Sequence, residues 1–158
     1  MLPQFLPGGR RFLFIAGANR AEGSVLYAGS LDSVERTPIM PVSSSVEFVS
    51  SRLDNSPGYL IFAHDRTLMA QAFDPGKLHI VGNAFPVAGP ITSVNAVGAD
   101  IGVGDFSATG GTLAYRSTGI PSVPETQPNG NVIMRPVGVK KDVGNIIVVQ
   151  NWIAAVKQ

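Results

Sequence analysis

The chain has 158 residues, a length that fits one domain, and its net charge of +1 argues against a strongly basic surface for nucleic acid or an anionic membrane. It contains no cysteine, which excludes disulfide bonds, cysteine-ligated zinc, iron–sulfur clusters and a thiol nucleophile. Its 18 glycines and 12 prolines divide the chain with frequent turns, so the composition predicts an all-β fold of many short strands.

The first ten residues lack the basic leader and apolar run of a secretory signal peptide. The apolar segment 146–156 is interrupted by Gln150 and Asn151, and it is shorter than the roughly 20 residues that a membrane-spanning helix needs. We therefore expect the chain as it stands to be cytoplasmic. If it is part of a longer membrane-anchored protein, we expect it to be periplasmic or otherwise extracytoplasmic.

A seven-residue pattern repeats along the chain: the Leu, Ala and Asp of segment 26–32 recur 42 residues later in segment 68–74. A turn and an apolar strand precede each copy, at residues 7–14 and 56–62, and a third half-copy covers residues 106–115. A period of about 40–45 residues with four strands per unit is typical of a β-propeller blade. A β-sandwich, which also has turns about every 8–12 residues, is the structural alternative.

The C-terminal part of the chain has a different pattern. Segment 120–131 contains three prolines and predicts a linker or irregular loop, which separates blades in residues 1–119 from C-terminal strands and a tail in residues 132–158. Segment 145–150 is the most β-prone run of the chain, and left unpaired it would form an uncharged edge prone to aggregation. We therefore expect residues 145–152 to pack on the blades, with Trp152 covering apolar surface.

Several short motifs occur in the order found in one family, and each motif by itself is weak. Together they resemble the TolB-like, WD-repeat-like β-propeller region of bacterial serine/threonine kinases. The motifs are Phe5–Phe14, Tyr27–Asp32, Gly58–Ala63, Arg66–Asp74, Phe106–Gly110 and Val148–Trp152, with Lys157 beyond them.

The resemblance implies a partial propeller of about two to three four-stranded blades, with a C-terminal strand and a short tail. It further implies a non-catalytic module that binds a protein or a ligand, as the sensor region of a receptor-type kinase would. Two features depart from the family: Gly8 replaces the turn aspartate, and the third copy stops after one hairpin. The chain thus resembles a truncated or internally deleted propeller with no kinase domain attached.

Two triplets imitate kinase motifs. Asp105-Phe106-Ser107 resembles the metal-binding triplet, and His64-Asp65-Arg66 is a scrambled catalytic loop. The Gly-rich loop, the strand lysine and the catalytic spacing of a kinase are all missing. Segment 102–107 also lacks the third glycine of a dinucleotide-binding fingerprint, and His79 fits an ordinary strand position. We predict no catalytic residue and no cofactor.

The best metal candidate is the loop with Asp100 and Asp105, but two carboxylates are too few for calcium without other ligands. We expect an ordinary loop between blades and no metal site. The basic pairs Arg10-Arg11 and Lys140-Lys141 lack interleaved aromatic residues, so we expect them to be solvated turns without nucleic-acid contact.

Three functional hypotheses follow from these features. The first is a non-catalytic propeller module for protein or ligand binding, with self-association possible through an exposed blade face. The second is a propeller hydrolase with acidic residues at its channel, which requires Asp100, Asp105 and His64 to cluster. The third is a decayed gene fragment without selected activity, which the missing blades suggest.

Overall fold

The computed structural model describes residues 3–17, 23–50, 57–95, 102–126, 132–136, 146–150 and 152–153. These residues form fourteen β-strands and no helix, which confirms the all-β prediction. No helix capable of crossing a membrane is therefore found in these segments.

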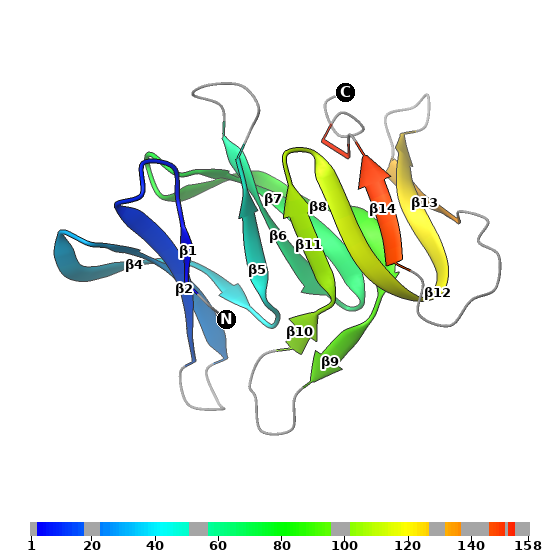
Figure 1. The fold of residues 1–158 in the computed structure, drawn as a ribbon, viewed down its shortest axis with the longest axis horizontal. Helices are drawn as coiled ribbons and strands as arrows, with labels where there is room; N and C mark the ends of the chain where they lie inside the picture. The colour runs from blue at the N-terminus through cyan, green and yellow to red at the C-terminus, as the bar shows by residue number, and fades with distance from the viewer. Residues whose placement is uncertain are drawn as a thin grey trace.

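The first sheet is an antiparallel meander of four strands in the order β1-β2-β3-β4 (Figure 1). Its turn between β1 and β2 uses Gly8 and Gly9, whose φ angles of +91° and +66° are costly for residues with a Cβ. Ser24, Leu26 and Ala28 are buried at alternate positions of β3, and Leu13 of β2, which lies opposite Ala28, is also buried, as a sheet with one face on the core requires. Its strands are β1 (Gln4–Phe5), β2 (Arg11–Gly17), β3 (Ser24–Ser30) and β4 (Ser33–Val42).

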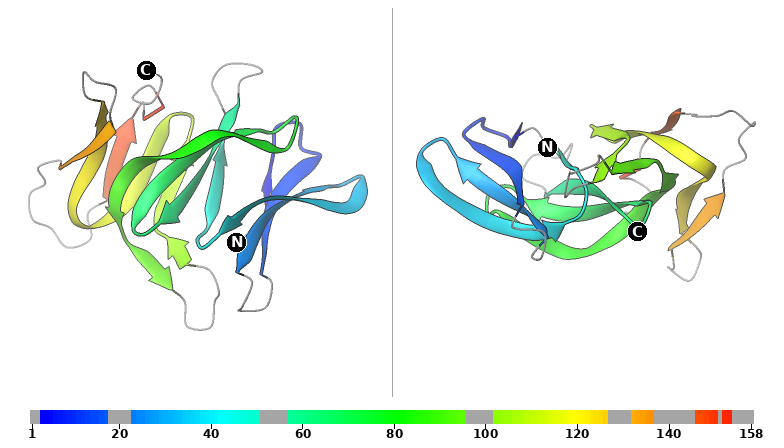
Figure 2. Two further views of the ribbon diagram at one scale, coloured as in Figure 1. Left: turned by 180° about the vertical axis from the view of Figure 1, so that it is seen from behind. Right: turned by 90° about the horizontal axis from the view of Figure 1, so that it is seen from below.

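The larger sheet follows the path β11-β12-β8-β7-β6-β5 and curls until its two end strands lie beside each other (Figures 1 and 2). The result is a nearly closed, barrel-like sheet of six strands. Its strands are β5 (Val46–Val49), β6 (Gly58–His64), β7 (Thr67–Asp74), β8 (His79–Ile91), β11 (Phe106–Thr109) and β12 (Thr112–Thr126).

Four shorter strands complete the fold: β9 (Ser93–Asn95), β10 (Gly102–Gly104), β13 (Val132–Pro136) and β14 (Ile146–Gln150). Strands β9 and β10 pair with each other, whereas β13 and β14 both pair with the long strand β12. Because β12 extends to Thr126, residues 120–126 of the expected linker are strand rather than irregular loop. Proline favours extended backbone, which explains why the proline-rich sequence is compatible with this strand.

The 42-residue repeat corresponds to two successive antiparallel meanders, β1–β4 and β5–β8. Leu26 and its repeat partner Leu68 are fully buried. Ala28 and its repeat partner Ala70 are exposed by no more than 2%. The recurring Leu and Ala are therefore core positions, whereas the recurring Asp32 and Asp74 are not buried.

Two apolar clusters lie on opposite sides of the β5–β7 sheet. Consecutive residues of β6 alternate between them: Leu60 packs with the first meander, and Ile61 packs inside the barrel-like sheet. The sheet β5–β7 is therefore the middle layer of the molecule, buried on both faces, which accounts for its nearly continuous run of apolar residues.

Strand β5 is joined to its neighbours by two side chains. The Gln4 side-chain amide donates to the Phe48 carbonyl at 3.0 Å and accepts from the Phe48 amide at 2.7 Å, so it links the first meander to β5. On the other side, a Glu47 carboxylate oxygen accepts from the Ala108 amide of β11 at 2.6 Å. Glu47 thus bridges the seam at which the six-stranded sheet nearly closes.

The C-terminal strand packs as the sequence predicts. Strand β14 pairs antiparallel with β12, from Thr112 opposite Gln150 to Arg116 opposite Ile146. Trp152 is only 2% exposed and packs edge-on against the ring of Tyr59, with 5.5 Å between ring centroids. The described part of this segment therefore covers the core of the barrel-like sheet.

The position of Glu47 at this seam leads us to expect an unusual pH dependence of the free energy of unfolding. Burial raises the pKa of Glu47 above its ordinary value of 4.5, and the hydrogen bonds from Ala108 and Ser107 offset only part of that rise. The carboxyl group of Glu47 therefore binds its proton more tightly in the folded state than in the unfolded state. The Glu47 contribution to the free energy of unfolding is greatest below pH 4.5 and falls as the pH rises through the raised pKa.

Glu47→Gln should remove this fall while keeping an oxygen that accepts from the Ala108 amide. Glu47→Ala should lower the free energy of unfolding by about 1–3 kcal/mol, because it leaves the Ala108 amide without its acceptor. Urea unfolding between pH 4 and pH 8 measures both effects. Asp65→Asn, at an exposed hairpin, controls for the loss of one charge; an unchanged pH slope in Glu47→Gln would contradict the assignment.

Candidate functional site

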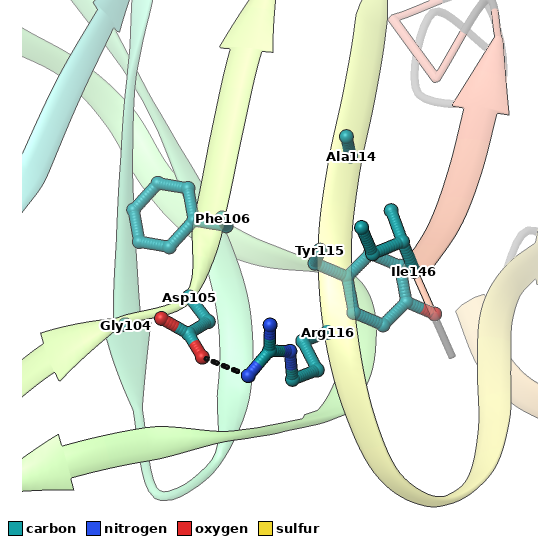
Figure 3. Close-up of a pocket in the computed structure, with 7 residues that line it drawn as sticks. All are labelled: Gly104, Asp105, Phe106, Ala114, Tyr115, Arg116 and Ile146. Atoms are coloured by element: carbon teal, nitrogen blue, oxygen red, sulfur yellow. Dashed lines mark ion pairs between the residues drawn. The ribbon is translucent and has the colours of Figure 1, made fainter. Parts of the chain in front are cut away.

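The acidic residue singled out in the sequence is part of a charged pair. Asp105 and Arg116 form an ion pair with 3.5 Å between the carboxylate and the guanidinium, and Figure 3 shows their charged groups facing each other. Their backbones are also joined, because the Arg116 amide donates to the Asp105 carbonyl at 2.9 Å. The pair lines an open pocket of about 300 Å³ together with Gly104, Phe106, Ala114, Tyr115 and Ile146.

This arrangement does not favour metal binding at Asp105. No group of three or more potential metal-ligating side chains occurs among the described residues, and Asp100 lies outside them. An aspartate already paired with an arginine is a poor ligand, since the cation competes for the same carboxylate.

The other polar candidates are separate from this pair. His64 and Asp65 contact each other at 3.3 Å on the exposed hairpin between β6 and β7, and His79 is exposed at the start of β8. The hydrolase hypothesis requires Asp100, Asp105 and His64 to cluster; among the described residues His64 contacts Asp65 and Asp105 contacts Arg116, and Asp100 lies outside them. Lys140-Lys141 lies outside the described residues.

The N-terminal basic pair has structural partners. Arg10 forms an ion pair with Asp32 across the end of the first meander. Arg11 donates to the carbonyls of Pro75 and Gly76 at 3.2 Å and 2.8 Å, which fastens this meander to the turn after β7. Both guanidinium groups are exposed but already bonded, so the pair holds the fold together rather than forming a basic patch.

An aromatic surface that the sequence analysis did not identify covers the outer face of the first meander. The cross-strand register places Phe5 opposite Phe12, and Phe14 opposite Tyr27, on the face away from the core. Successive ring centroids along Phe5, Phe12, Phe14 and Tyr27 are separated by 5.9, 5.8 and 5.7 Å. We call this outer surface the aromatic face. An antiparallel sheet usually presents polar side chains on such a face.

A groove of about 480 Å³ crosses the aromatic face. Its floor is Gly29, which lies opposite Phe12 and allows the Phe12 ring to lie directly over the backbone. Arg36 closes one side, with its guanidinium carbon 4.6 Å above the centre of the Tyr27 ring. The full lining is Pro3, Phe12, Phe14, Gly29, Ser30, Ser33, Val34, Glu35 and Arg36.

The pattern of Phe12, Leu13 and Phe14 is visible in the sequence, but it reads equally well as a strand buried on both faces. Tyr27 and Arg36 join the aromatic face only through strand pairing, because they lie on β3 and β4 respectively. The available signal in β2 was the pair of aromatic residues Phe12 and Phe14 on the side of Leu13 where a half-buried strand would carry polar residues.

Comparison of the chain with protein-family models, curated proteins and solved structures finds no match. The TolB-like resemblance therefore remains a prediction from the sequence motifs.

The two surfaces differ in the chemistry they can perform. The aromatic face offers ring surfaces, a cation and a carboxylate, which suit stacking and apolar contact. The smaller pocket offers one neutralised ion pair. Neither contains a nucleophile beside a base, or acids of separated pKa, among the described residues. What the described residues of both surfaces do offer is contact surface for a bound molecule.

Tyr115 provides a test of the core behind the smaller pocket. Its side chain is 1% exposed, its hydroxyl has no hydrogen-bond partner among the described residues, and burial raises the pKa of its phenol. Tyr115→Phe should therefore raise the free energy of unfolding by about 1 kcal/mol, because it removes a desolvated hydroxyl without changing the packing. Tyr59→Phe is the matched control in denaturant unfolding. A loss of stability in Tyr115→Phe would show that the hydroxyl is bonded.

Gly29 provides a test of the groove. A Cβ at this position would lie 2.8 Å from Cζ and 2.9 Å from Cε2 of Phe12, so Gly29→Ala must displace the ring. The contacted atoms are the far end of a half-exposed side chain, so the cost should be about 1 kcal/mol or less. We expect large changes in the Phe12 ring chemical shifts in NMR spectra with little change in melting temperature. Unchanged ring shifts would contradict the close packing of Phe12 on Gly29.

Proposed function

We propose that this chain is a non-catalytic binding module of the β-propeller type, and that the aromatic face is its docking surface. The observation that carries the proposal is the row of four aromatic side chains on the outer face of β1–β3, where a solvated sheet would present polar groups.

Two features support the propeller part of the proposal. The 42-residue recurrence matches two consecutive four-stranded meanders, and these meanders pack face to face through a shared apolar cluster. Strands β11 and β12, with β14 beside β12, form a third layer on the other side of the second meander. These three layers support the count of two to three blades that the resemblance to the TolB-like family implies.

The residues of the aromatic face favour an apolar or aromatic partner over a polyanion. Phe5 is 55% exposed, and among the described residues the charged side chains that line the groove are Glu35 and Arg36, whose charges cancel. Nucleic-acid binding depends on an excess of basic over acidic side chains, and the described residues of this surface have no such excess. Contact with an apolar partner would remove ring surface from water, at roughly 25 cal/mol for each Å² covered.

Indole is a suitable probe, because it is a small aromatic molecule without charge. We expect indole titration, followed by NMR of the aromatic resonances, to shift the signals of Phe5, Phe12, Phe14 and Tyr27 more than those of other rings. Phe14→Leu should weaken this binding several-fold, since it removes a ring that stacks on Tyr27.

Phe85→Leu is the matched control, because the Phe85 ring packs against Tyr59 in the core of the barrel-like sheet. This variant should bind indole as the unsubstituted chain does. Shifts spread evenly over all aromatic residues, or the same affinity in Phe14→Leu, would refute the aromatic face as a docking surface.

A further inference from the structure

The units of this fold have two unlike faces. In the first meander, one face is the aromatic face and the other carries Leu13, Leu26 and Ala28, which are buried. In the second meander, the face equivalent to the aromatic face carries Phe48 and Leu60.

The first of two internal interfaces joins these surfaces. Leu13, Leu26 and Ala28 share a single cluster with Phe48 and Leu60. The aliphatic side of the first unit therefore covers the phenylalanine-bearing side of the second. The repeat equivalence shows what the aromatic face of the first unit is shaped to receive, which is the aliphatic side of another unit.

The second interface follows the same rule. The aliphatic side of the second meander carries Ile61, Leu68 and Ala70, and it shares a cluster with Leu113 and Tyr115 of the third unit. Phe106 of β11 also packs into this cluster. Tyr59 and Phe85 also pack against this cluster, so the second interface is aromatic on both sides. The two interfaces share one feature: the side that carries the repeated Leu and Ala residues packs on an aromatic-bearing side of the next unit along the sequence.

Two end faces remain uncovered by described residues. One is the aromatic face. The other is the outward side of β12 and β14, which we call the aliphatic face. Its apolar residues are Ala114, Ile146 and Val148, with Val148 opposite Ala114, and the polar residues Thr112, Arg116 and Gln150 lie on the same side. Ile146 and Val148 are 68% and 58% exposed, which is unusual for side chains of their size.

We propose that a second copy of this chain covers the aromatic face with its own aliphatic face, in a head-to-tail arrangement. This inference rests on the proposed function, because it names the partner of the same docking surface. Each contact would repeat the packing already present twice within one chain. Interfaces of this kind are heterologous, so two copies can close into a ring through two equal contacts.

The shapes and charges of the two end faces are compatible with this contact. The aliphatic face is hollowed by the pocket beside Ile146 and Ala114, whereas Phe5 on the aromatic face is exposed and free to enter such a hollow. Each face also carries a balanced pair of charges, Glu35 with Arg36 in the groove and Asp105 with Arg116 at the pocket, so neither face repels the other through a net charge. With two to three blade-like units in each chain, a ring of two copies would contain about four to six units, within the range of four to eight known for propellers.

Sedimentation velocity of the full chain over a wide range of concentration tests the proposal. We expect reversible association, and we expect Phe5→Glu on the aromatic face and Val148→Glu on the aliphatic face each to weaken it about tenfold or more. Arg36→Glu is a second aromatic-face variant at an exposed side chain, in case Phe5→Glu does not fold. Val81→Glu, an exposed position on neither end face, is the matched control and should associate normally.

Mixing the two variants gives the decisive result. Phe5→Glu keeps its aliphatic face and Val148→Glu keeps its aromatic face, so the mixture should form a one-to-one pair through the single intact contact. Association of Val148→Glu by itself would indicate pairing between two aromatic faces and would overturn the proposal. A chain that stays monomeric at every concentration would also overturn it, as would association that neither variant weakens.

The indole titration separates this inference from the proposed function. If monomeric Val148→Glu binds indole at the aromatic face but the unsubstituted chain never associates, the docking surface stands and the second copy is not its partner. If indole does not bind there, the docking surface itself is refuted.

Discussion

The fold depends on how the short strand β5 is held between its neighbours. A backbone ladder joins β5 to β6 on one side only. On its other side, the Gln4 amide replaces a neighbouring strand by bonding both backbone groups of Phe48, and the Glu47 carboxylate reaches the amide of Ala108. The Gln4 and Glu47 side chains thus provide partners for backbone groups of Phe48 and Ala108 at the seam. Through these bonds the four residues of β5 connect all three layers.

This arrangement explains why the middle layer tolerates burial on both faces. Residues of β5 alternate between the two apolar clusters, with Phe48 on one side and Val49 on the other. Gly58 on the adjacent strand completes the fit, because a Cβ there would lie 2.5 Å from the Phe48 ring. The half-buried Glu47 is the cost of closing the seam, since a carboxylate loses hydration that two hydrogen bonds only partly replace.

The same layered packing connects the fold to the function that we propose. A stack of sheets in which every unit covers the next leaves two unlike faces at its ends, and here one is aromatic and the other aliphatic. The charged residues that the sequence offered as chemistry are used to maintain the structure instead: Asp105 holds Arg116, and Arg11 fastens the first meander to the turn after β7. Packing within one chain therefore accounts for these charged residues, but it does not account for the exposed apolar side chains on the two end faces.

The sequence by itself determined the fold class, the repeat and the packing of the C-terminal strand. These depend on local properties: turn residues, alternation of apolar side chains, and the β-branched run of residues 146–149 with Trp152 close behind. Local signals failed for residues 120–126, because proline fits a linker and an extended strand equally well, and only pairing with β13 distinguishes them. The aromatic face was decided by the tertiary structure. Which side of β2 meets the core, and which residues of β3 and β4 lie beside Phe12 and Phe14, depends on strand register, and register is set by contacts between residues far apart in the chain.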